Sequence, residues 1–119
     1  MDAANLLAAG VYVVAEGANM PTTLRGSSIF LESRALYGPA KAANAGGVAV
    51  SGLEMTQNNM RYNSSREEID GRLREIMKNI HGASLQAAER FGVPGNHVSG
   101  ANIAGFLEVA NAMMDQGIV

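Results

Sequence analysis

The sequence predicts an α/β fold in which a short parallel β-sheet is followed by long α-helices. Three observations support this prediction. Two short apolar runs, each ended by turn residues, are typical of strands buried beneath helices. A segment with a helix signal separates the two runs, which is the order of a βαβ unit and therefore of a parallel sheet. The second half of the chain carries apolar residues at three- and four-residue steps, the period of amphipathic helices.

The chain begins with a predicted helix and strand. Residues 2–9 read as a short helix that ends at Gly10. Residues 11–15 are apolar and rich in β-branched side chains, without polar alternation, so we expect this strand to be buried on both faces. The turn residues 16–21 end the strand.

The second helix and strand complete the βαβ unit. Thr22 or Thr23 can cap a helix that runs to about Ser33. Residues 35–37 form a second short strand, which Gly38 and Pro39 close.

The remainder of the chain is predicted to be helical. A helix rich in small residues covers about 44–59, and Ser65 with Glu68 fits a capping box that opens the next helix. Gly92 and Pro94 end that helix. Its apolar positions are Ile69, Leu73, Ile76, Ile80, Ala83, Ala87 and Phe91.

A last helix is expected over about 99–116. Its apolar face comprises Ile103, Phe106, Leu107, Ala110, Met113 and Met114.

Composition limits the class of protein. The chain has 119 residues, about one domain, and 47% hydrophobic against 17% charged residues excludes intrinsic disorder and permits a modest core. A net charge of −2 argues against nucleic-acid binding. The absence of cysteine excludes disulfides, thiolate zinc sites and cysteine nucleophiles. His81 and His97 lack metal-ligand spacing, so we expect no metal site.

Targeting signals are weak. The longest apolar run, residues 6–15, is far shorter than the roughly 20 residues that span a bilayer. Asp2 and Glu16 flank it where a signal peptide requires other residues. We therefore expect a cytoplasmic chain with no membrane partner.

The number of strands is small for this class of fold. A doubly wound sheet usually has five or six strands, whereas two are visible. We therefore expect residues 1–119 to be a portion of a larger fold.

Two loops are candidates for ligand binding, because open α/β sheets bind ligands beyond the carboxyl ends of their strands. They cover residues 16–21 and 38–47, and contain Asn19 and Asn44 respectively. An asparagine side chain offers a donor and an acceptor to a carboxamide or a ribose hydroxyl. The alternatives are that Asn19 bonds its own backbone and that Asn44 is a plain helix N-cap.

The helix after the second loop carries a candidate stripe. Asn44, Val48, Ser51 and Met55 follow helical steps, so Ser51 could offer a hydroxyl to an anionic group beside an apolar wall at Val48. Glycines at 46, 47 and 52 cost about 1 kcal/mol each against alanine, which indicates close approach to a ligand or to another helix. Tight helix packing is the alternative.

Other candidates are weaker. Lys41 is expected to be solvated, and His97 to be an ordinary loop histidine without a partner. Residues 100–105 have the wrong glycine spacing for a dinucleotide motif, so Gly100 and Gly105 are expected to allow close helix packing.

Three motifs together resemble a known family. Residues 14–23, 39–58 and 100–106 are similar, in this order, to the signatures of hexameric glutamate dehydrogenases, and the likeness is greatest to the bacterial NADP-dependent type. The resemblance covers essentially the whole chain. Ala40 and His97 depart from residues common in the family, but neither is a proposed contact.

The resemblance implies which part of such an enzyme is present. Residues 1–119 would be the C-terminal portion of a Rossmann-like nucleotide-binding domain, followed by helices that return toward the substrate domain. The N-terminal substrate domain, the glycine-rich dinucleotide turn and the catalytic lysine and aspartate would lie outside it. We therefore expect no catalytic residue in this chain, no activity of the chain alone, and a homohexamer for the intact protein.

The resemblance also assigns cofactor contacts. Gly17, Ala18 and Asn19 would bind NADP, with Asn19 at the nicotinamide-ribose end. NAD is possible, because the turn that discriminates the 2′-phosphate is not in this chain.

The substrate side is implied in the same way. Asn44 would lie near the nicotinamide and substrate, while Ser51, beside Val48, would hydrogen-bond the side-chain carboxylate of L-glutamate or 2-oxoglutarate. Ammonia would be the third reactant. Two alternatives remain: a dehydrogenase for apolar amino acids, and a helical packing or oligomerisation module without a ligand site.

Overall fold

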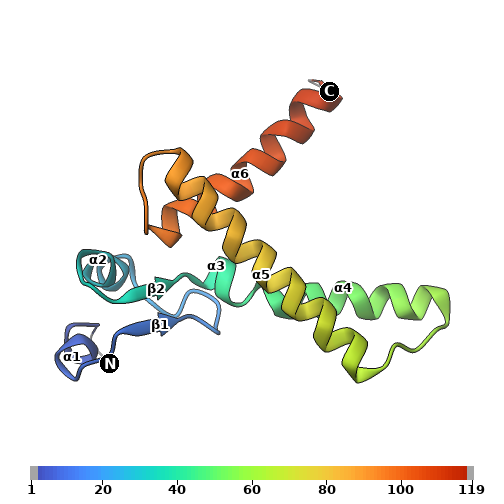
Figure 1. Ribbon diagram of the computed structural model, residues 1–119, viewed down its shortest axis with the longest axis horizontal. Coiled ribbons are helices and arrows are strands. Elements are labelled where there is room, and N and C mark those ends of the chain that lie inside the picture. The colour runs from blue at the N-terminus through green and yellow to red at the C-terminus, as the bar shows by residue number, and fades with distance from the viewer. Residues whose placement is uncertain (1–2, 118–119) are drawn as a thin grey trace.

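The computed structural model describes residues 3–117 of the chain, so Asp2 of the expected first helix lies outside it. A small sheet with two helices occupies one end of the molecule, and three longer helices lead away from it (Figure 1). The predicted α/β class is confirmed. In chain order the elements are α1 (Ala3–Ala8), β1 (Val13–Ala15), α2 (Leu24–Glu32), β2 (Leu36–Gly38), α3 (Ala40–Ala43), α4 (Ala45–Met60), α5 (Arg66–Arg90) and α6 (His97–Gln116).

The sheet is the predicted βαβ unit. β1 and β2 are parallel, with Val14 opposite Tyr37 in the register, and α2 connects them. Thr23 caps α2, since its side chain accepts a hydrogen bond from the backbone N–H of Gly26 at 3.2 Å. Each strand has three residues, and β1 begins later than the expected residue 11.

A small core lies between the sheet and its two helices. Ala3, Phe30 and Tyr37 are buried there, and the rings of Phe30 and Tyr37 have centroids 5.2 Å apart. Val14 packs against this cluster, but Val13 is 49% exposed. The expectation that the first strand is buried on both faces is therefore wrong for the described chain, because successive side chains point to opposite faces and α1 and α2 cover one of them.

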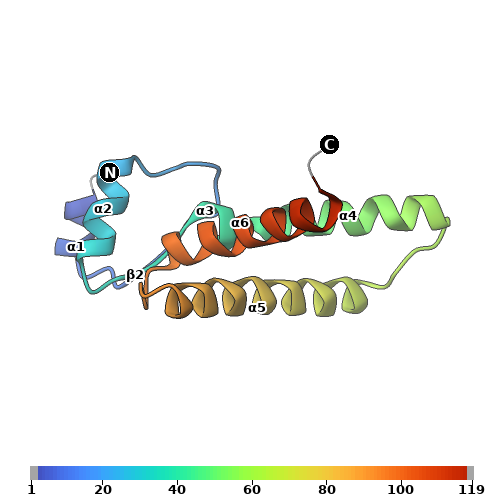
Figure 2. The same ribbon diagram turned by 90° about the horizontal axis from the view of Figure 1, so that it is seen from above.

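The long helices begin where the sequence predicts. Ser65 and Glu68 form the capping box of α5, with both reciprocal hydrogen bonds present. α6 begins at His97, earlier than expected, because Asn96 caps it by accepting a hydrogen bond from the N–H of Ser99 at 2.9 Å. Figure 2 shows α6 lying above α5, while α4 extends to the far end of the molecule.

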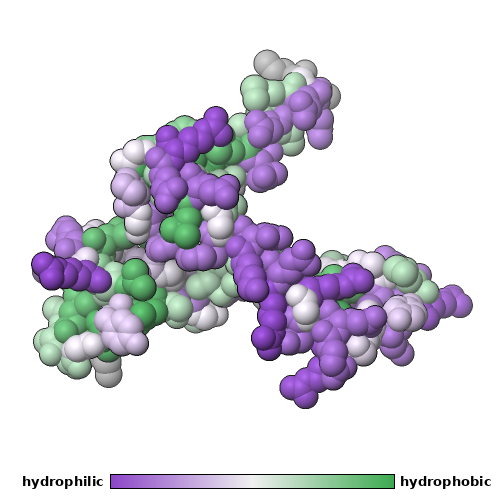
Figure 3. Space-filling view, viewed as in Figure 1, coloured by the Kyte–Doolittle hydropathy of each residue, from purple (hydrophilic) through white to green (hydrophobic). Residues whose placement is uncertain are grey.

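The described chain is open rather than compact. Its radius of gyration is 17.0 Å, against about 13.5 Å for a compact domain of this length. Its accessible surface is 8889 Å², against roughly 6,100 Å² for a folded monomer of this mass. The expected apolar face of the last helix is largely uncovered, since Phe106 is 69% and Met114 74% exposed. Hydrophobic residues gather around the sheet end, whereas hydrophilic ones dominate the α4–α5 end (Figure 3).

Within the part of the chain that the structure describes, no helix is both long and apolar enough to cross a membrane.

Candidate functional site

The segments that follow β1 and β2 meet at the carboxyl edge of the sheet. The backbone N–H of Glu16 donates to the carbonyl of Gly38 at 3.1 Å, which continues the strand pairing into the loops. Beyond it, the side-chain amide of Asn44 donates from Nδ2 to the carbonyl oxygen of Ala18 at 3.0 Å. The structure thus brings together the two loops that the sequence singled out.

The first loop presents small residues and an unpaired carboxamide. Gly17, Ala18 and Asn19 are exposed, and nothing lies within 4 Å of the position that a Cβ on Gly17 would occupy. Among residues 3–117, no partner hydrogen-bonds the side chain of Asn19. The alternative that Asn19 bonds its own backbone is therefore not what the structure shows.

Asn44 has a different role from a plain N-cap. It occupies the N-cap position of α4, but its side chain makes no capping hydrogen bond. The amide is instead used to hold Ala18, in the loop after the other strand. Asn44 therefore ties the start of α4 to the first loop, and its amide oxygen accepts no hydrogen bond from the described residues.

Ser51 and Val48 lie on an exposed face of α4. Val48 is 78% exposed, and Met55 further along the stripe is 63% exposed. The Ser51 hydroxyl donates to the carbonyl of Gly47, one turn earlier, at 3.1 Å. Because the hydroxyl is exposed, it can exchange this neutral hydrogen bond for a stronger one to an anion.

The glycines of α4 divide into two kinds. A Cβ on Gly46 would lie 2.9 Å from Leu73 Cδ1 and 3.2 Å from the sulfur of Met77, both on α5. Tight helix packing therefore explains Gly46. Nothing lies within 4 Å of a Cβ on Gly47 or Gly52, so packing within the described chain does not explain those two.

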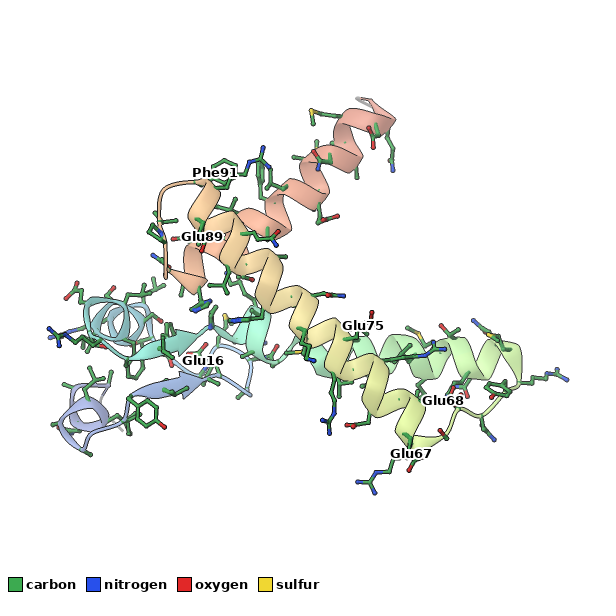
Figure 4. The ribbon with its side chains drawn as sticks, in the orientation of Figure 1. Glu16, Glu67, Glu68, Glu75, Glu89 and Phe91 are labelled. Carbon is green, nitrogen blue, oxygen red and sulfur yellow. The ribbon has the colours of Figure 1, made fainter. Side chains whose placement is uncertain are left out.

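Sequence reasoning missed Glu16 as a structural centre of this site. Its carboxylate is buried and accepts hydrogen bonds from the Tyr37 hydroxyl at 2.6 Å and from the Ala40 N–H at 2.8 Å. The Tyr37 hydroxyl also lies 3.0 Å from Ser27 Oγ. Figure 4 shows Glu16 beside the two strands. A charged residue directly after an apolar strand was the signal available in the sequence.

Hydrogen bonding keeps Glu16 ionised. Burial alone raises the pKa of the Glu16 carboxyl, but hydrogen bonds from Thr22, Tyr37 and Ala40 outweigh it, and the pKa lies below its usual value. Burial and the hydrogen bond to Glu16 raise the pKa of Tyr37. The pair is therefore a carboxylate that accepts from a neutral phenol at neutral pH.

His97 differs from expectation, whereas Lys41 is exposed, as predicted. His97 is not a loop residue without a partner: it begins α6, and its ring stacks on that of His81 with centroids 5.3 Å apart. Burial and the neighbouring His81 charge lower the pKa of His97. Lys41 lies in α3 and donates to Asn102 Oδ1 on α6. Across residues 3–117, no three His, Asp or Glu side chains gather in a way that could hold a metal ion.

The two glycines of α6, Gly100 and Gly105, also differ in how closely they are packed. A Cβ on Gly100 would overlap the Ser84 carbonyl oxygen, so Gly100 serves close packing of α6 on α5, as expected. Gly105 faces open space, and the same expectation for it is wrong within the described chain.

A cavity of about 280 Å³ borders the second loop, since Gly38, Pro39, Ala42 and Ala43 are part of its lining. It is mostly apolar, and its lining includes Val13, Leu36, Met77 and the two stacked histidines. Asn19, Asn44 and Ser51 are not part of its wall. The cavity and the three candidate contact residues are therefore separate features of the described chain.

Comparison with known proteins places this geometry in context. The sequence model of the family described as Glutamate/Leucine/Phenylalanine/Valine dehydrogenase matches residues 1–117. A glutamate dehydrogenase of Bacteroides thetaiotaomicron is 54% identical over 117 residues, covering 98% of this chain and 26% of the relative. An NADP-specific glutamate dehydrogenase of Escherichia coli is 52% identical over 120 residues, covering 100% of this chain and 27% of the relative.

Solved structures of glutamate dehydrogenases are also similar to this chain. One glutamate dehydrogenase structure superposes with a TM-score of 0.93 at 46% identity, over 98% of this chain and 26% of its own. A Plasmodium falciparum glutamate dehydrogenase superposes with a TM-score of 0.93 at 45% identity, over 98% of this chain and 25% of its own. The chain therefore spans about a quarter of the length of the relatives that it matches.

Proposed function

Because this chain belongs to the Glutamate/Leucine/Phenylalanine/Valine dehydrogenase family, we propose that it is part of an enzyme that interconverts L-glutamate with 2-oxoglutarate and ammonia, using NADP(H). The observation that carries the proposal is the hydrogen bond from Asn44 to Ala18, which joins the two loops at the carboxyl edge of the sheet. That edge is where open α/β folds bind their ligands.

The first loop would hold the nicotinamide end of the cofactor. No described residue hydrogen-bonds the carboxamide of Asn19, and Gly17 and Ala18 leave open space in which a dinucleotide can approach the backbone. These residues therefore fit the group. When bound, NADP supplies the site that accepts or gives up the hydride. Relatives named NADP-specific support NADP, and one named NAD(P)-specific leaves NAD as a second cofactor.

The exposed face of α4 would hold the amino-acid substrate. Ser51 would donate its hydroxyl to the side-chain carboxylate, beside the apolar surface of Val48, while Asn44 lies at the junction with the cofactor loop. A carboxylate is a better acceptor than the Gly47 carbonyl that Ser51 now uses. A substrate without that carboxylate gains nothing from Ser51, which favours glutamate over leucine, valine or phenylalanine.

The rest of the catalytic machinery would lie outside these residues. We place residues 1–119 in the C-terminal portion of a Rossmann-like nucleotide-binding domain with its following helices, and assign no catalytic residue to them. The open surface of the described chain agrees with a portion that packs on further protein. The homohexameric assembly, the cytoplasmic location and a role in nitrogen assimilation rest on the resemblance alone.

The test uses the intact protein that contains this chain. We expect glutamate-dependent reduction of NADP by the intact protein and none by residues 1–119 alone. Ser51→Ala should raise the KM for glutamate at least about tenfold, since a hydrogen bond to a charged group contributes about 1.5–3 kcal/mol. Thr56→Ala on the same helix is the matched control, because Thr56 also donates to the carbonyl one turn earlier, at 2.9 Å.

The kinetic results distinguish the proposed function from its two alternatives. Unchanged glutamate kinetics in Ser51→Ala would support helix packing in place of a substrate site. A substrate panel in which leucine, valine or phenylalanine outperforms glutamate would support the apolar alternative. Turnover by residues 1–119 alone would contradict the assignment of the catalytic groups to another part of the protein.

A further inference from the structure

Glu16 joins segments that are far apart in the sequence. It follows β1, yet its two carboxylate oxygens accept hydrogen bonds from Tyr37 on β2, at 2.6 Å, and from the N–H of Ala40 at the start of α3, at 2.8 Å. Through the Tyr37 hydroxyl, 3.0 Å from Ser27 Oγ, the network also reaches α2. The proposed function assigns no role to this carboxylate.

These hydrogen bonds and the backbone between the bonded residues form a closed circuit that contains the proposed site. The carboxylate of Glu16 holds Ala40, and the carbonyl of Ala40 accepts from the N–H of Asn44 at 2.9 Å across the single turn of α3. The side chain of Asn44 then holds the carbonyl of Ala18, which lies in the same loop as Glu16. A movement of Glu16 must therefore change the spacing between Asn19 and Asn44.

The exposure of the residues in this hydrogen-bonded circuit shows which of them can hold the others in place. Glu16 is 7% and Tyr37 4% exposed, so solvent cannot readily replace their hydrogen bonds. Ala18 and Asn19 are exposed, and water competes for the contacts of that loop. A buried, charge-assisted hydrogen bond is stronger than an exposed neutral one. The order of the exposed loop thus depends on the buried carboxylate beneath it.

We propose that Glu16 is a positioning residue, which holds the Asn19 loop and Asn44 at the spacing needed to bind the nicotinamide end of the dinucleotide. This inference rests on the proposed function. Glu16 does not exchange a proton in the reaction, because both of its oxygens are used as acceptors beneath the loops and its side chain is buried.

The experiment compares variants of the intact protein. Glu16→Ala removes every hydrogen bond to the carboxylate and should raise the KM for NADP about tenfold or more, with a smaller change in the KM for glutamate. Glu16→Gln should recover most of this loss, because its amide oxygen can still accept from Ala40 while its NH₂ donates to the Tyr37 oxygen. The pH profile of kcat should keep its shape in Glu16→Gln.

Glu68→Ala is the matched control. Glu68 also accepts a backbone N–H through its carboxylate, at 2.7 Å from Ser65 N, but lies at the start of α5, away from the loops (Figure 4). We expect a lower Tm and an unchanged KM for NADP. If Glu16→Ala fails to fold, Tyr37→Phe removes one hydrogen bond and keeps the ring that packs on Phe30, and it should raise the same KM by a smaller factor.

Amide hydrogen exchange provides a readout independent of activity. Glu16→Ala should speed exchange at Ala40 and Asn44, whereas Glu68→Ala should not. If the unaltered protein shows no glutamate-dependent reduction of NADP, the proposed function fails, and exchange alone then decides whether Glu16 holds the loops. Wild-type exchange and KM in Glu16→Ala, or an equal rise of the KM in Glu68→Ala, would overturn the inference.

Discussion

The sheet end and the long-helix end of this chain are stabilised in opposite ways. At the sheet end, Phe30 and Tyr37 are 2% and 4% exposed, and the buried polar atoms of Glu16 are hydrogen-bonded within the chain. At the other end, Val48 on α4 and Phe106 on α6 are 78% and 69% exposed. The sheet end has a buried core and hydrogen-bonds its buried carboxylate, although Val13 and Leu36 remain exposed, whereas α4 and α6 leave most of their apolar faces uncovered.

This difference is informative about the site. The loops that carry Asn19 and Asn44 follow the two strands, and hydrogen bonds from the N–H of Ala40 to Glu16 and from Asn44 to Ala18 within the chain connect them. Ser51 lies on the exposed face of α4, at the long-helix end. The proposed cofactor contacts therefore lie beside the buried core of the chain, while the proposed substrate contact, Ser51, lies on an exposed helix face.

The largest expected effect concerns the core of the sheet end. Phe30→Ala in the intact protein should lower the free energy of unfolding by about 3–5 kcal/mol, because it empties the space beside Tyr37. Leu24→Ala on the same helix is the control, since Leu24 is 90% exposed and should cost less than about 0.5 kcal/mol. Urea unfolding measures both, and equal losses would contradict the assignment of a buried core to this end.

The crossing of α5 and α6 should be the next most sensitive point. Gly100→Ala places a methyl group against the Ser84 carbonyl and should destabilise the protein by about 1–3 kcal/mol. Gly105→Ala on the same helix meets open space, so its higher helix propensity should stabilise by up to about 1 kcal/mol. Thermal unfolding of the two variants should shift in opposite directions. A loss in both would show that the outer face of α6 is also closely packed.

The start of α5 should show a smaller effect. Ser65→Ala removes the capping hydrogen bond to the N–H of Glu68, at 3.2 Å, and should cost about 1 kcal/mol. Ser64→Ala next to it is the control, with no expected change beyond about 0.5 kcal/mol. A cost above about 2 kcal/mol for Ser65→Ala would mean that the exposed end of the helix pair is packed against something more than solvent.

The smallest expected effect is a dependence of the unfolding free energy on pH, caused by His97 at the start of α6. The pKa of His97 is lowered by burial and by His81, so the unfolded chain binds a proton more readily than the folded one. Stability should be full above the unfolded pKa of about 6.5 and decrease as pH falls toward the lowered folded pKa. His97→Gln should reduce the difference in unfolding free energy between pH 7.5 and 5.5. A stability that rises on acidification over this range would contradict the assignment.

Much of the local structure was predictable from the sequence. The Ser65 capping box and the Thr23 cap depend on residue types at short spacings, the parallel pairing followed from the order strand, helix, strand, and the structure shows all three. The selection of the two loops followed from strand order alone. Such features are decided by backbone and side-chain chemistry within a few residues, which a sequence displays directly.

The contacts that make a site of these loops were not predictable in the same way. The sequence indicated a helix cap at Asn44, but its side chain binds Ala18. It indicated a turn residue at Glu16, but the carboxylate binds Tyr37 and Ala40. It indicated no partner for His97, but the ring stacks on His81. Each of these pairs joins residues well separated in the chain.

The sequence by itself determined the α/β class, the caps and the motifs that resemble glutamate dehydrogenases, because these depend on local propensity and residue order. The tertiary structure alone decided which glycines are packed, which apolar faces are uncovered and which carboxylate holds the loops together. The physical reason is that burial and long-range hydrogen bonds depend on which distant segments meet, and periodicity along one helix or strand does not specify that partner.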